Sequence, residues 1–457
     1  MAAAAPSNYL AFNAEAQQKA IDTHGASLAK GVANMLQDAK QGHMSMTDES
    51  LFEVGKNVAT TEGAVVFENE FFQLIEYKPL TDKVHEKPFL LVPPCINKFY
   101  ILDLQPENSF IRYAVSQGHR TFVVSWRNPD ASMEKKTWDD YIEHAAIEAI
   151  HRVQEITGQD KKGGQINALG FCVGGTILTT ALAVLAARGE KPVSALTLLT
   201  TLVDFSDTGI LDVFIDEACI GALEESMAKK GYLDGNDMAG SFRMLRSNPL
   251  IWHYWEHSYL LGEPLPPFDV LFWNVDSTRM PQAMHSYYLR EMYLNNNLIK
   301  RDKLTIAGES IDLDDIVQPL YAVTAEDDHI APWKQCYRIR KYINVEAPVR
   351  FVLSTSGHIL GIVNPPVKPP KRSYRVGPAR RTDRLGAPGS TQLHATYTPN
   401  ICIPQRLPIG RCLYILPFKW RAWHPPPVPP QRRTSPPRRS GRRRAWRADL
   451  QCSSRSA

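Results

Sequence analysis

The sequence predicts an α/β fold in which a mostly parallel sheet is covered by helices on both faces and is interrupted by an inserted cap. Between residues 64 and 366, short runs rich in Val, Ile and Leu alternate with longer helical segments, which is the pattern of a buried parallel sheet. Residues 206–310 break this alternation and are rich in Trp, Tyr and Pro. Glycines also flank Cys172 at a point where a strand turns into a helix.

The elements are expected in the following order. Residues 1–63 form an N-terminal helical segment, because 8–60 are rich in Ala, Gln, Lys and Asp with a loose helical period. The core has a first part, 64–205, and a second part, 311–366, on either side of the cap at 206–310. Helices are expected at 138–157 and 176–189. Strands are expected at 71–77, 88–92, 121–126, 165–169, 193–201, 319–325 and 349–353.

The charge of the chain changes abruptly near residue 366. Residues 367–457 hold 20 Lys and Arg, two acidic residues and 15 of the 33 prolines, whereas residues 1–366 hold 32 basic and 46 acidic residues. The overall net charge of +4 hides this division. An Arg- and Pro-rich tail without periodicity has little apolar surface to bury, so we expect residues 367–457 to be disordered.

Composition also narrows the cellular setting. The seven cysteines are scattered and include no C-x-x-C pair, which favours a reducing, cytosolic compartment over a disulfide framework. The N-terminus lacks the basic start and apolar run of a signal peptide. No stretch approaches the roughly 20 apolar residues that a transmembrane helix needs, so we expect no transmembrane segment.

The most informative motif is Gly170-Phe171-Cys172-Val173-Gly174, which follows the strand at 165–169 and precedes the helix at 176–189. This is the G-x-S-x-G nucleophile elbow of the α/β-hydrolase fold with cysteine in the place of serine. The sharp turn needs small residues two positions before and after the nucleophile. The turn also places the Cys172 sulfur at a helix N-terminus, which favours a thiolate.

A nucleophile in this fold needs an acid and then a histidine farther along the chain. His358 follows the last predicted strand, where a catalytic base belongs. The strand at 319–325 is followed by Glu326-Asp327-Asp328-His329, and we choose Asp328 as the acid. Asp327 is its nearest competitor, and Asp204 is a rival because it follows the strand at 193–201.

The oxyanion hole requires two backbone N–H groups directed at the reacting carbonyl oxygen. One should belong to Val173, directly after the nucleophile. The other should come from the loop after the strand at 88–92, which reads Pro93-Pro94-Cys95-Ile96-Asn97. Proline has no N–H, so the donor is Cys95 or Ile96, and we choose Ile96.

No metal site is expected. His253 and His257 have the i, i+4 spacing of a metal-binding helix, but the sequence lacks the H-E-x-x-H order and a third ligand. We therefore interpret both as structural histidines of the cap.

Cysteine at the elbow suggests acyl transfer rather than hydrolysis. An acyl group on Cys172 is a thioester, as activated as the thioester of an acyl-CoA, so exchange between the two is nearly isoenergetic. The acyl group then remains ready for attack by a hydroxyl group. An acyltransferase or polymerase using acyl-CoA fits this chemistry.

Several blocks of the sequence resemble the class I poly(3-hydroxyalkanoate) synthases, members of the α/β-hydrolase superfamily. The resemblance rests on GFCVGGT at 170–176 and on five further strings: LLVPPCINKFYILDL at 90–104, VSWRNPD at 124–130, TLLTTLVDFSDTGIL at 197–211, EDDHIAPW at 326–333 and SGHILGIVNPP at 356–366. It covers about residues 8–366, and Val173 after the elbow cysteine agrees with class I.

The resemblance implies a catalytic set of Cys172 as the acylated nucleophile, His358 as its base and Asp328 as the essential acid. It implies that (R)-3-hydroxyacyl-CoA, with 3-hydroxybutyryl-CoA as the short-chain example, is polymerised into polyester with release of CoA. The CoA thioester is then a substrate, and no cofactor is expected. The expected partners are a second copy of the chain in a homodimer, the growing polyester and the surface of cytoplasmic polyhydroxyalkanoate granules.

The chain departs from this family at both ends. Its N-terminal helical segment is short for the family, and after Pro366 an Arg/Pro-rich tail stands in place of a Trp-rich helical segment. We interpret the tail as the product of a reading-frame shift rather than as a nucleic-acid-binding arm, so no nucleic-acid partner is expected. Two alternative functions remain: a thioesterase or polyester depolymerase on the same fold, and an inactive granule-associated protein.

Overall fold

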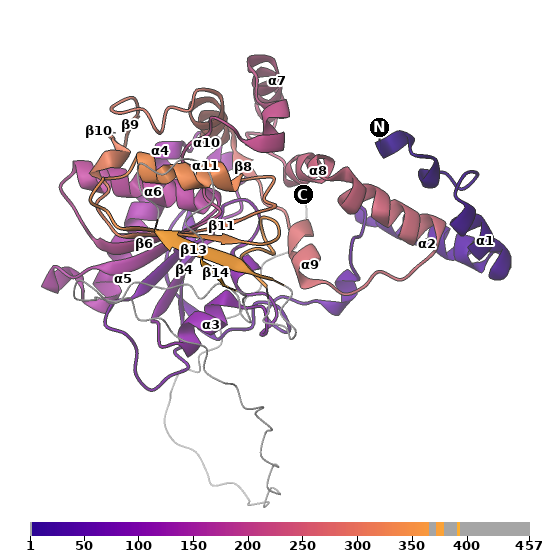
Figure 1. Cartoon of the computed structure of the whole chain (residues 1–457), viewed down its shortest axis with the longest axis horizontal. Helices are drawn as coiled ribbons and strands as arrows, with labels where there is room; N and C mark the ends of the chain where they lie inside the picture. The colour runs from indigo at the N-terminus through magenta and orange to yellow at the C-terminus, as the bar shows by residue number, and fades with distance from the viewer. Residues whose placement is uncertain (1, 365–371, 379–390, 394–457) are drawn as a thin grey trace, which may run out of the picture.

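The computed structural model describes residues 2–364, 372–378 and 391–393, and it is built around one large sheet. The strands are β1 Gly63–Glu68, β2 Phe72–Tyr77, β3 Phe89–Val92, β4 Thr121–Trp126, β5 Ile166–Phe171, β6 Val193–Leu199, β11 Leu320–Ala325, β12 Val349–Ser354, β13 Tyr374–Pro378 and β14 Thr391–Leu393. They lie in the order β1-β2-β4-β3-β5-β6-β11-β12-β13-β14 (Figure 1).

The mostly parallel sheet expected from the sequence is confirmed. The six strands from β4 to β12 in this order pair in parallel, whereas β1, β2, β13 and β14 pair antiparallel with their neighbours. All seven predicted strands are present. Strand β1 was not predicted; it is the edge strand of the sheet, and its side chains are only half-buried or exposed.

Both faces of the sheet are covered. In β3, Leu90 and Val92 belong to one apolar cluster, and Phe89 and Leu91 belong to the other, as the alternation of side chains along a strand requires. On the first face lie α4 Trp138–Tyr141, η6 Ile142–Ile147, α5 Glu148–Thr157, α6 Val173–Ala187 and α11 Trp333–Tyr337. On the second face lie η4 Phe99–Leu102 and α3 Phe110–Ser116 (Figure 1).

The cap, residues 206–310, is built mainly of short helices between β6 and β11. Its elements are η8 Gly209–Phe214, α7 Glu217–Met227, β7 Tyr232–Leu233, α8 Gly235–Leu245, η9 Asn248–Trp252, η10 Trp255–Leu260, α9 Asp269–Val275, β8 Met280–Pro281, α10 Gln282–Tyr287, η11 Tyr288–Leu294, β9 Thr305–Ile306 and β10 Glu309–Ser310. Strand β7 pairs with β8, and β9 pairs with β10.

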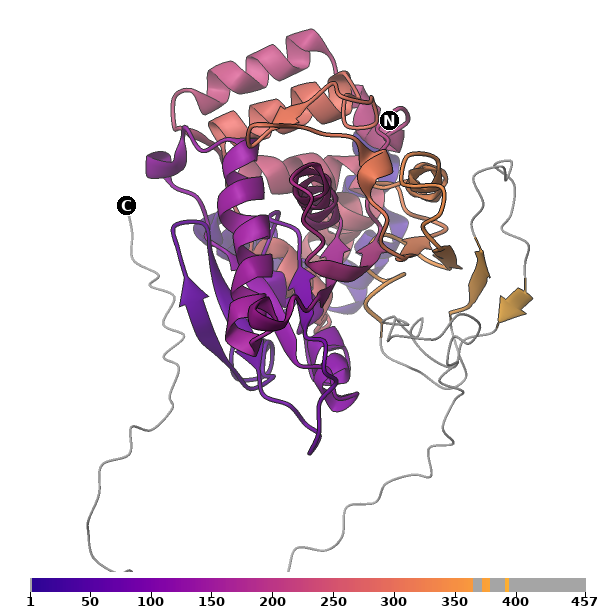
Figure 2. The same ribbon diagram turned by 90° about the vertical axis from the view of Figure 1, so that its left-hand side faces the viewer.

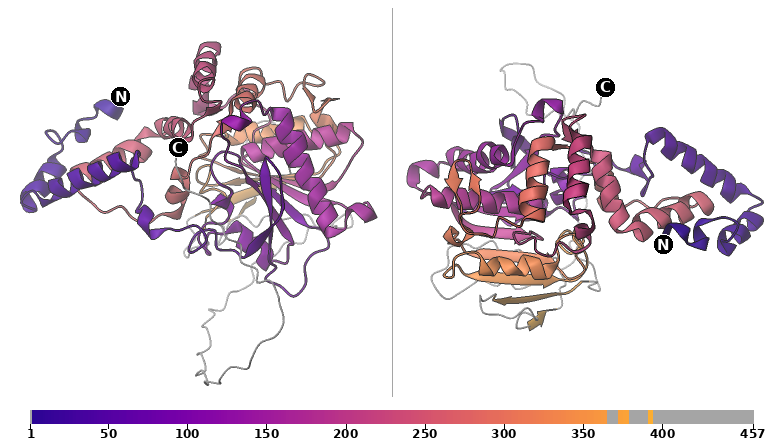
Figure 3. Two further views of the ribbon diagram at one scale, coloured as in Figure 1. Left: turned by 180° about the vertical axis from the view of Figure 1, so that it is seen from behind. Right: turned by 90° about the horizontal axis from the view of Figure 1, so that it is seen from above.

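The N-terminal helices pack on the middle of the cap rather than on the sheet. Helix α2 Ala26–Gln41 packs on η10, and α1 Ala14–Asp22 packs on α2; all three project from the sheet (Figure 3). A Cβ atom on Gly31 would lie 1.9 Å from the Tyr259 carbonyl oxygen, so glycine allows the two backbones to meet. The Tyr259 hydroxyl donates to Asp38 at 2.5 Å.

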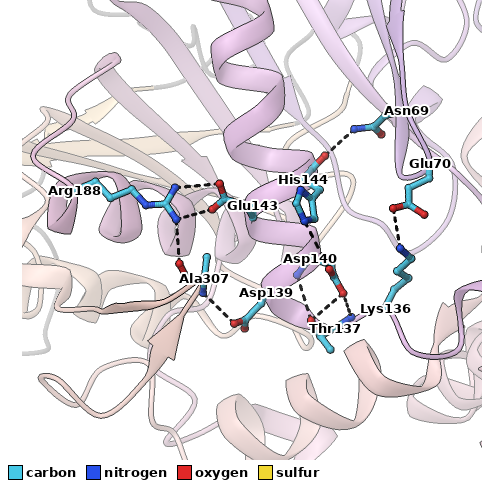
Figure 4. A network of polar contacts seen from close by, with 10 residues as sticks. All are labelled: Asn69, Glu70, Lys136, Thr137, Asp139, Asp140, Glu143, His144, Arg188 and Ala307. Carbon is cyan, nitrogen blue, oxygen red and sulfur yellow. Dashed lines mark hydrogen bonds and ion pairs between the residues drawn. The ribbon is translucent and has the colours of Figure 1, made fainter.

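A polar network ties the end of the cap to the sheet domain (Figure 4). Arg188, after α6, donates to both carboxylate oxygens of Glu143 at 3.1 and 2.7 Å and to the Ala307 carbonyl at 3.0 Å. The Ala307 N–H donates to Asp139 at 3.0 Å. Thr137 and Asp140 form a capping box at the start of α4. The β9–β10 turn is therefore fixed to two helices of the core.

Two short parts of the basic tail have regular structure, which differs from the disorder expected for residues 367–457. Strand β13 pairs antiparallel with β12, and β14 pairs with β13, at the sheet edge opposite β1 (Figure 2). An exposed edge of a sheet offers unpaired N–H and C=O groups that an extended segment can satisfy. The expectation of disorder otherwise falls outside the described residues.

No helix of the described residues is long and apolar enough to span a membrane.

Candidate active site

Cys172 is the single residue between β5 and α6, and it forms the turn with φ 53° and ψ −128°. A left-handed φ on a non-glycine residue costs about 1–3 kcal/mol and is typical of functional sites. The Cys172 N–H donates to the Leu199 carbonyl of β6 at 2.9 Å, which holds the turn against the neighbouring strand. The side chain is half-buried, at the N-terminus of a 15-residue helix.

The glycines of the motif are required by close packing. A Cβ on Gly170 would lie 2.3 Å from the Cα of Gly175, and one on Gly175 would lie 2.0 Å from the Thr201 hydroxyl oxygen. A Cβ on Gly174 would lie 2.3 Å from the Pro93 carbonyl oxygen and 2.4 Å from that of Val92. The start of α6 therefore packs directly on the backbone at the end of β3.

This crowding gives a prediction about stability. Gly174→Ala is expected to lower the free energy of unfolding by about 3 kcal/mol, because backbone oxygens cannot move aside as a flexible side chain can. Gly221→Ala is the matched control: it lies in α7 with nothing within 4 Å of the added Cβ, so it should raise stability by up to about 1 kcal/mol. Urea unfolding followed by circular dichroism compares the two, and equal midpoints would contradict the packing argument.

The acid and the histidine meet because their strands are neighbours. Strands β11 and β12 pair in parallel with Ala325 opposite Ser354, so the two following loops leave the same edge of the sheet. The Asp327 N–H donates to the Ser356 carbonyl at 2.9 Å and joins these loops. His358 Nδ1 then donates to Asp328 Oδ2 at 2.7 Å, and each of the two residues is only 7% exposed.

Asp328 has a fixed orientation. Its Oδ1 accepts hydrogen bonds from the backbone N–H groups of Ile330 and Ala331, both at 2.9 Å, which leaves Oδ2 for His358. The bond at Nδ1 leaves the other ring nitrogen of His358 for Cys172. The ring also stacks on Phe171, with centroids 5.8 Å apart.

The surroundings of His358 favour the imidazolium. Burial opposes the charge and is the largest single effect, but the negative charges of Asp328 and Cys172, with a hydrogen bond from the ring to each, raise the pKa of His358 well above its usual range. This arrangement is a Cys–His–Asp chain in which the histidine and the aspartate are buried. It can move a proton between sulfur and nitrogen while the carboxylate stabilises the charge on the ring.

The two rival acids have other environments. Asp327 is exposed, although it adjoins Asp328. Asp204 is buried, but its carboxylate accepts from the Ser206 N–H, the Asn296 amide and the Tyr342 hydroxyl at 2.7 to 3.0 Å. Among the described residues, Asp328 is the one of the three carboxylates that bonds to His358.

One predicted oxyanion donor belongs to the elbow itself and the other to the loop after β3. Val173 is the first residue of α6, and Ile96 lies in the loop that follows β3. Because β3 pairs in parallel with β5, with Val92 opposite Gly170, this loop leaves the sheet beside Cys172. Burial and, to a smaller extent, the charge of Cys172 raise the pKa of the Cys95 thiol to about 12, in agreement with the proximity of the two cysteines. The role of both N–H groups stays a prediction.

Sequence reasoning assigned no role to the tyrosines beside the nucleophile. Burial raises the pKa values of Tyr288 and Tyr293, and the charge of Cys172 contributes to both shifts. The Tyr288 ring stacks on Trp138 with centroids 5.1 Å apart, and Tyr293 packs on Phe205. Helix η11 of the cap therefore supplies an aromatic wall near Cys172. The aromatic residues of this helix were visible in the sequence, but the direction in which the helix presents them was not.

The paired histidines of the cap have an ordinary environment. His257 Nδ1 bonds to Glu263 at 2.6 Å, and its ring lies 4.3 Å from that of His253. Over residues 2–364, 372–378 and 391–393, no group of three or more His, Cys, Asp or Glu side chains is arranged to hold a metal ion.

Comparison with known proteins gives two family matches and close relatives. Residues 1–114 match the model for the N-terminus of poly-beta-hydroxybutyrate polymerase (PhaC), and residues 88–365 match that for the alpha/beta hydrolase fold. The chain is 52% identical over 403 residues to the poly(3-hydroxyalkanoate) polymerase subunit PhaC of Cupriavidus necator, covering 87% of this chain and 67% of that protein.

Two further relatives agree. The PhaC subunit of Rhizobium meliloti is 42% identical over 385 residues, covering 83% of this chain and 62% of that protein. Poly(3-hydroxyalkanoate) polymerase 1 of Ectopseudomonas oleovorans is 41% identical over 396 residues, covering 86% and 68%. The chain thus spans about two thirds of the length of the curated relatives that it matches.

Proposed function

The chain belongs to the poly(3-hydroxyalkanoate) polymerase family, and from this membership we propose that it polymerises (R)-3-hydroxyacyl-CoA into polyhydroxyalkanoate with release of CoA. The observation that carries the proposal is the buried His358–Asp328 pair beside the half-buried Cys172, in a chain 52% identical to a named polymerase subunit. The substrate is expected to be short-chain, such as 3-hydroxybutyryl-CoA.

In the first step, Cys172 takes the acyl group. His358 holds the thiol proton, and the thiolate attacks the carbonyl carbon of the CoA thioester. The negative charge that develops on the carbonyl oxygen is stabilised by the N–H groups of Val173 and Ile96. The bond from carbon to the CoA sulfur breaks, and the imidazolium of His358 returns its proton to the leaving CoA thiolate. The products are free CoA and an acyl thioester on Cys172.

In the second step, a hydroxyl group takes the acyl group from Cys172. His358 accepts the proton of the 3-hydroxyl of another 3-hydroxyacyl-CoA, and its oxygen attacks the Cys172 thioester. An ester bond forms, the carbon–sulfur bond breaks and the proton passes to the Cys172 sulfur. The product is a longer acyl-CoA, which can acylate Cys172 again. Asp328 keeps the imidazole in the required tautomer and stabilises its charge in both steps.

Two other functions fit the same residues. A thioesterase or polyester depolymerase would use water in the second step, and an inactive granule-associated protein would use neither step. Family membership favours the polymerase over both. We also assign the protein, as part of the proposal, to the cytoplasm at the surface of polyhydroxyalkanoate granules, as a homodimer and without a cofactor.

One assay separates the three functions. The full chain is given (R)-3-hydroxybutyryl-CoA, free CoA is measured with a thiol reagent, and the product is sized by chromatography. The polymerase releases CoA and forms polyester, whereas a hydrolase releases CoA together with free 3-hydroxybutyrate. Absence of CoA release, with Cys172 still open to alkylation, would overturn the catalytic proposal. The Cys172→Ala variant measures the background rate of CoA release in the absence of the nucleophile.

A further inference from the structure

A segment of the cap holds the loop that carries the predicted oxyanion donor. This segment, residues 273–278, makes hydrogen bonds to the loop at residues 95–100. The Trp273 indole N–H donates to the Lys98 carbonyl at 2.7 Å. The Tyr100 hydroxyl donates to Asp276 at 2.9 Å. The Asn97 side-chain amide donates to the Asn274 carbonyl at 3.4 Å. Two further bonds involve Thr278, which is only 3% exposed.

Thr278 uses both functions of its hydroxyl group on this loop. Its Oγ1 donates to the Cys95 carbonyl at 3.0 Å and accepts from the Asn97 N–H at 2.7 Å. It therefore bonds the backbone on both sides of Ile96. Asn97 has a φ of 61°, in the left-handed region that asparagine adopts more readily than other non-glycine residues.

These two bonds determine where the Ile96 N–H points. The Cys95 carbonyl and the Ile96 N–H belong to one planar trans peptide unit and so point in opposite directions. Because Thr278 binds that carbonyl, the N–H of Ile96 points away from Thr278. Pro93, two residues before this loop, packs on the start of α6 at Gly174, beside Cys172. Among the described residues outside the loop, no side chain other than that of Thr278 bonds the Cys95 carbonyl or the Asn97 N–H.

We propose that Thr278 is a positioning residue for acyl transfer: its hydroxyl orients the peptide that presents the Ile96 N–H to the oxyanion, and so makes acylation of Cys172 depend on the docking of residues 273–278. This inference rests on the proposed function for its reaction. It predicts that loss of the hydroxyl slows the steps in which an oxyanion forms. Reactions of the Cys172 sulfur that form no oxyanion keep their rate.

The test compares three variants of the full chain. Thr278→Val keeps the shape and removes the hydroxyl, and Thr278→Ser keeps a hydroxyl at this position. Ser277→Ala removes the neighbouring hydroxyl, which donates to the Val275 carbonyl within the cap at 3.4 Å. Each is assayed for CoA release from (R)-3-hydroxybutyryl-CoA, for the acylation burst with p-nitrophenyl acetate and for alkylation of Cys172 by iodoacetamide. Alkylation is a displacement at carbon and forms no oxyanion. Thermal unfolding confirms that each variant is folded.

Thr278→Val is expected to lower kcat for CoA release and the acylation rate roughly 10- to 100-fold, because a displaced donor loses much of the stabilisation that a whole donor supplies. KM and the alkylation rate should stay within about twofold. Thr278→Ser should recover most of the rate, and Ser277→Ala should match the unmodified chain.

Equal acylation rates for Thr278→Val and the unmodified chain would overturn the inference. So would a loss of alkylation matching the loss of acylation, because the variant would then have disturbed the nucleophile itself. The p-nitrophenyl ester separates this outcome from failure of the proposed function. If the unmodified chain is acylated by the ester but releases no CoA from the thioester, the polymerase proposal fails while the role of Thr278 is still measured.

Discussion

Cys172→Ala is expected to abolish CoA release, with a loss on the order of 10⁴-fold or more, because covalent catalysis has no other nucleophile at this position. Cys172→Ser should retain at most about 1% of the rate. A serine hydroxyl loses its proton far less readily than a thiol, and the oxoester it forms is less reactive than a thioester toward the next hydroxyl. CoA release and the mass of the acylated protein measure both effects.

A cysteine outside the site provides the control for this prediction. Cys219 is exposed on α7, and Cys219→Ala should release CoA at a rate within about twofold of the unmodified chain. Polymer formation by Cys172→Ala above a few per cent of the normal rate would exclude the thioester mechanism. Loss of activity in Cys219→Ala, with Cys172→Ala still active, would instead identify Cys219 in the cap as the nucleophile.

Asp328→Asn is expected to lower the acylation rate about 10⁴-fold while the protein stays folded. The Ile330 and Ala331 N–H groups both donate to Oδ1, so the oxygen of the new amide must occupy that position. Its NH₂ group then faces His358 Nδ1 and donates to it. The imidazole is forced into the tautomer that carries its proton on the nitrogen beside Cys172, where it cannot accept another.

The pH dependence of this variant has a definite sign. Asp328 raises the pKa of His358 by its charge and by its hydrogen bond, so its removal lowers that pKa. The imidazolium, which is populated below the pKa, is then lost at a lower pH than in the unmodified chain. Its contribution to stability is fully present below the unfolded pKa of about 6.5 and disappears as the pH rises through the folded pKa. Unfolding of both proteins measured from pH 5 to 9 should therefore diverge most at the acidic end.

The competing carboxylates supply matched controls. Asp327→Asn changes an exposed side chain and should leave the acylation rate within about threefold. Asp204→Asn leaves a buried hydrogen-bonded network with a mismatched amide, so it should lower the free energy of unfolding by about 1–3 kcal/mol and spare acylation in the folded fraction. An inactive Asp204→Asn beside an active Asp328→Asn would reverse the assignment.

Local sequence was sufficient to predict the strands of the sheet and the elbow at Cys172. The strand at 166–171 and the helix from Val173 are each set by their own residues, and Gly170, Gly174 and Gly175 report a close approach of backbones that only glycine permits. The nucleophile, the acid and the histidine also occur along the sequence in the order that this fold requires. These features were predictable because strand, turn and helix preferences act over a few residues.

The choice among the three acids required the tertiary structure. Asp204, Asp327 and Asp328 all follow strands, and their positions in the sequence do not separate them. Burial and hydrogen-bond partners do: Asp204 is held by residues from 206 to 342 along the chain, and Asp327 points to solvent. Which carboxylate reaches His358 depends on how the loops after β11 and β12 leave the sheet.

The sequence by itself determined a mostly parallel α/β sheet, a cysteine nucleophile at its elbow and the regions from which the base and acid come. Only the tertiary structure decided that Asp328 bonds His358 and that α2 packs on η10. It also decided that Thr278 binds the loop of the predicted oxyanion donor through Asn97, 181 residues before it in the chain. Hydrophobic periodicity and turn chemistry are local and leave a signal in the sequence. A hydrogen bond between distant residues leaves none, because any threonine could make it and only the fold brings one to the loop.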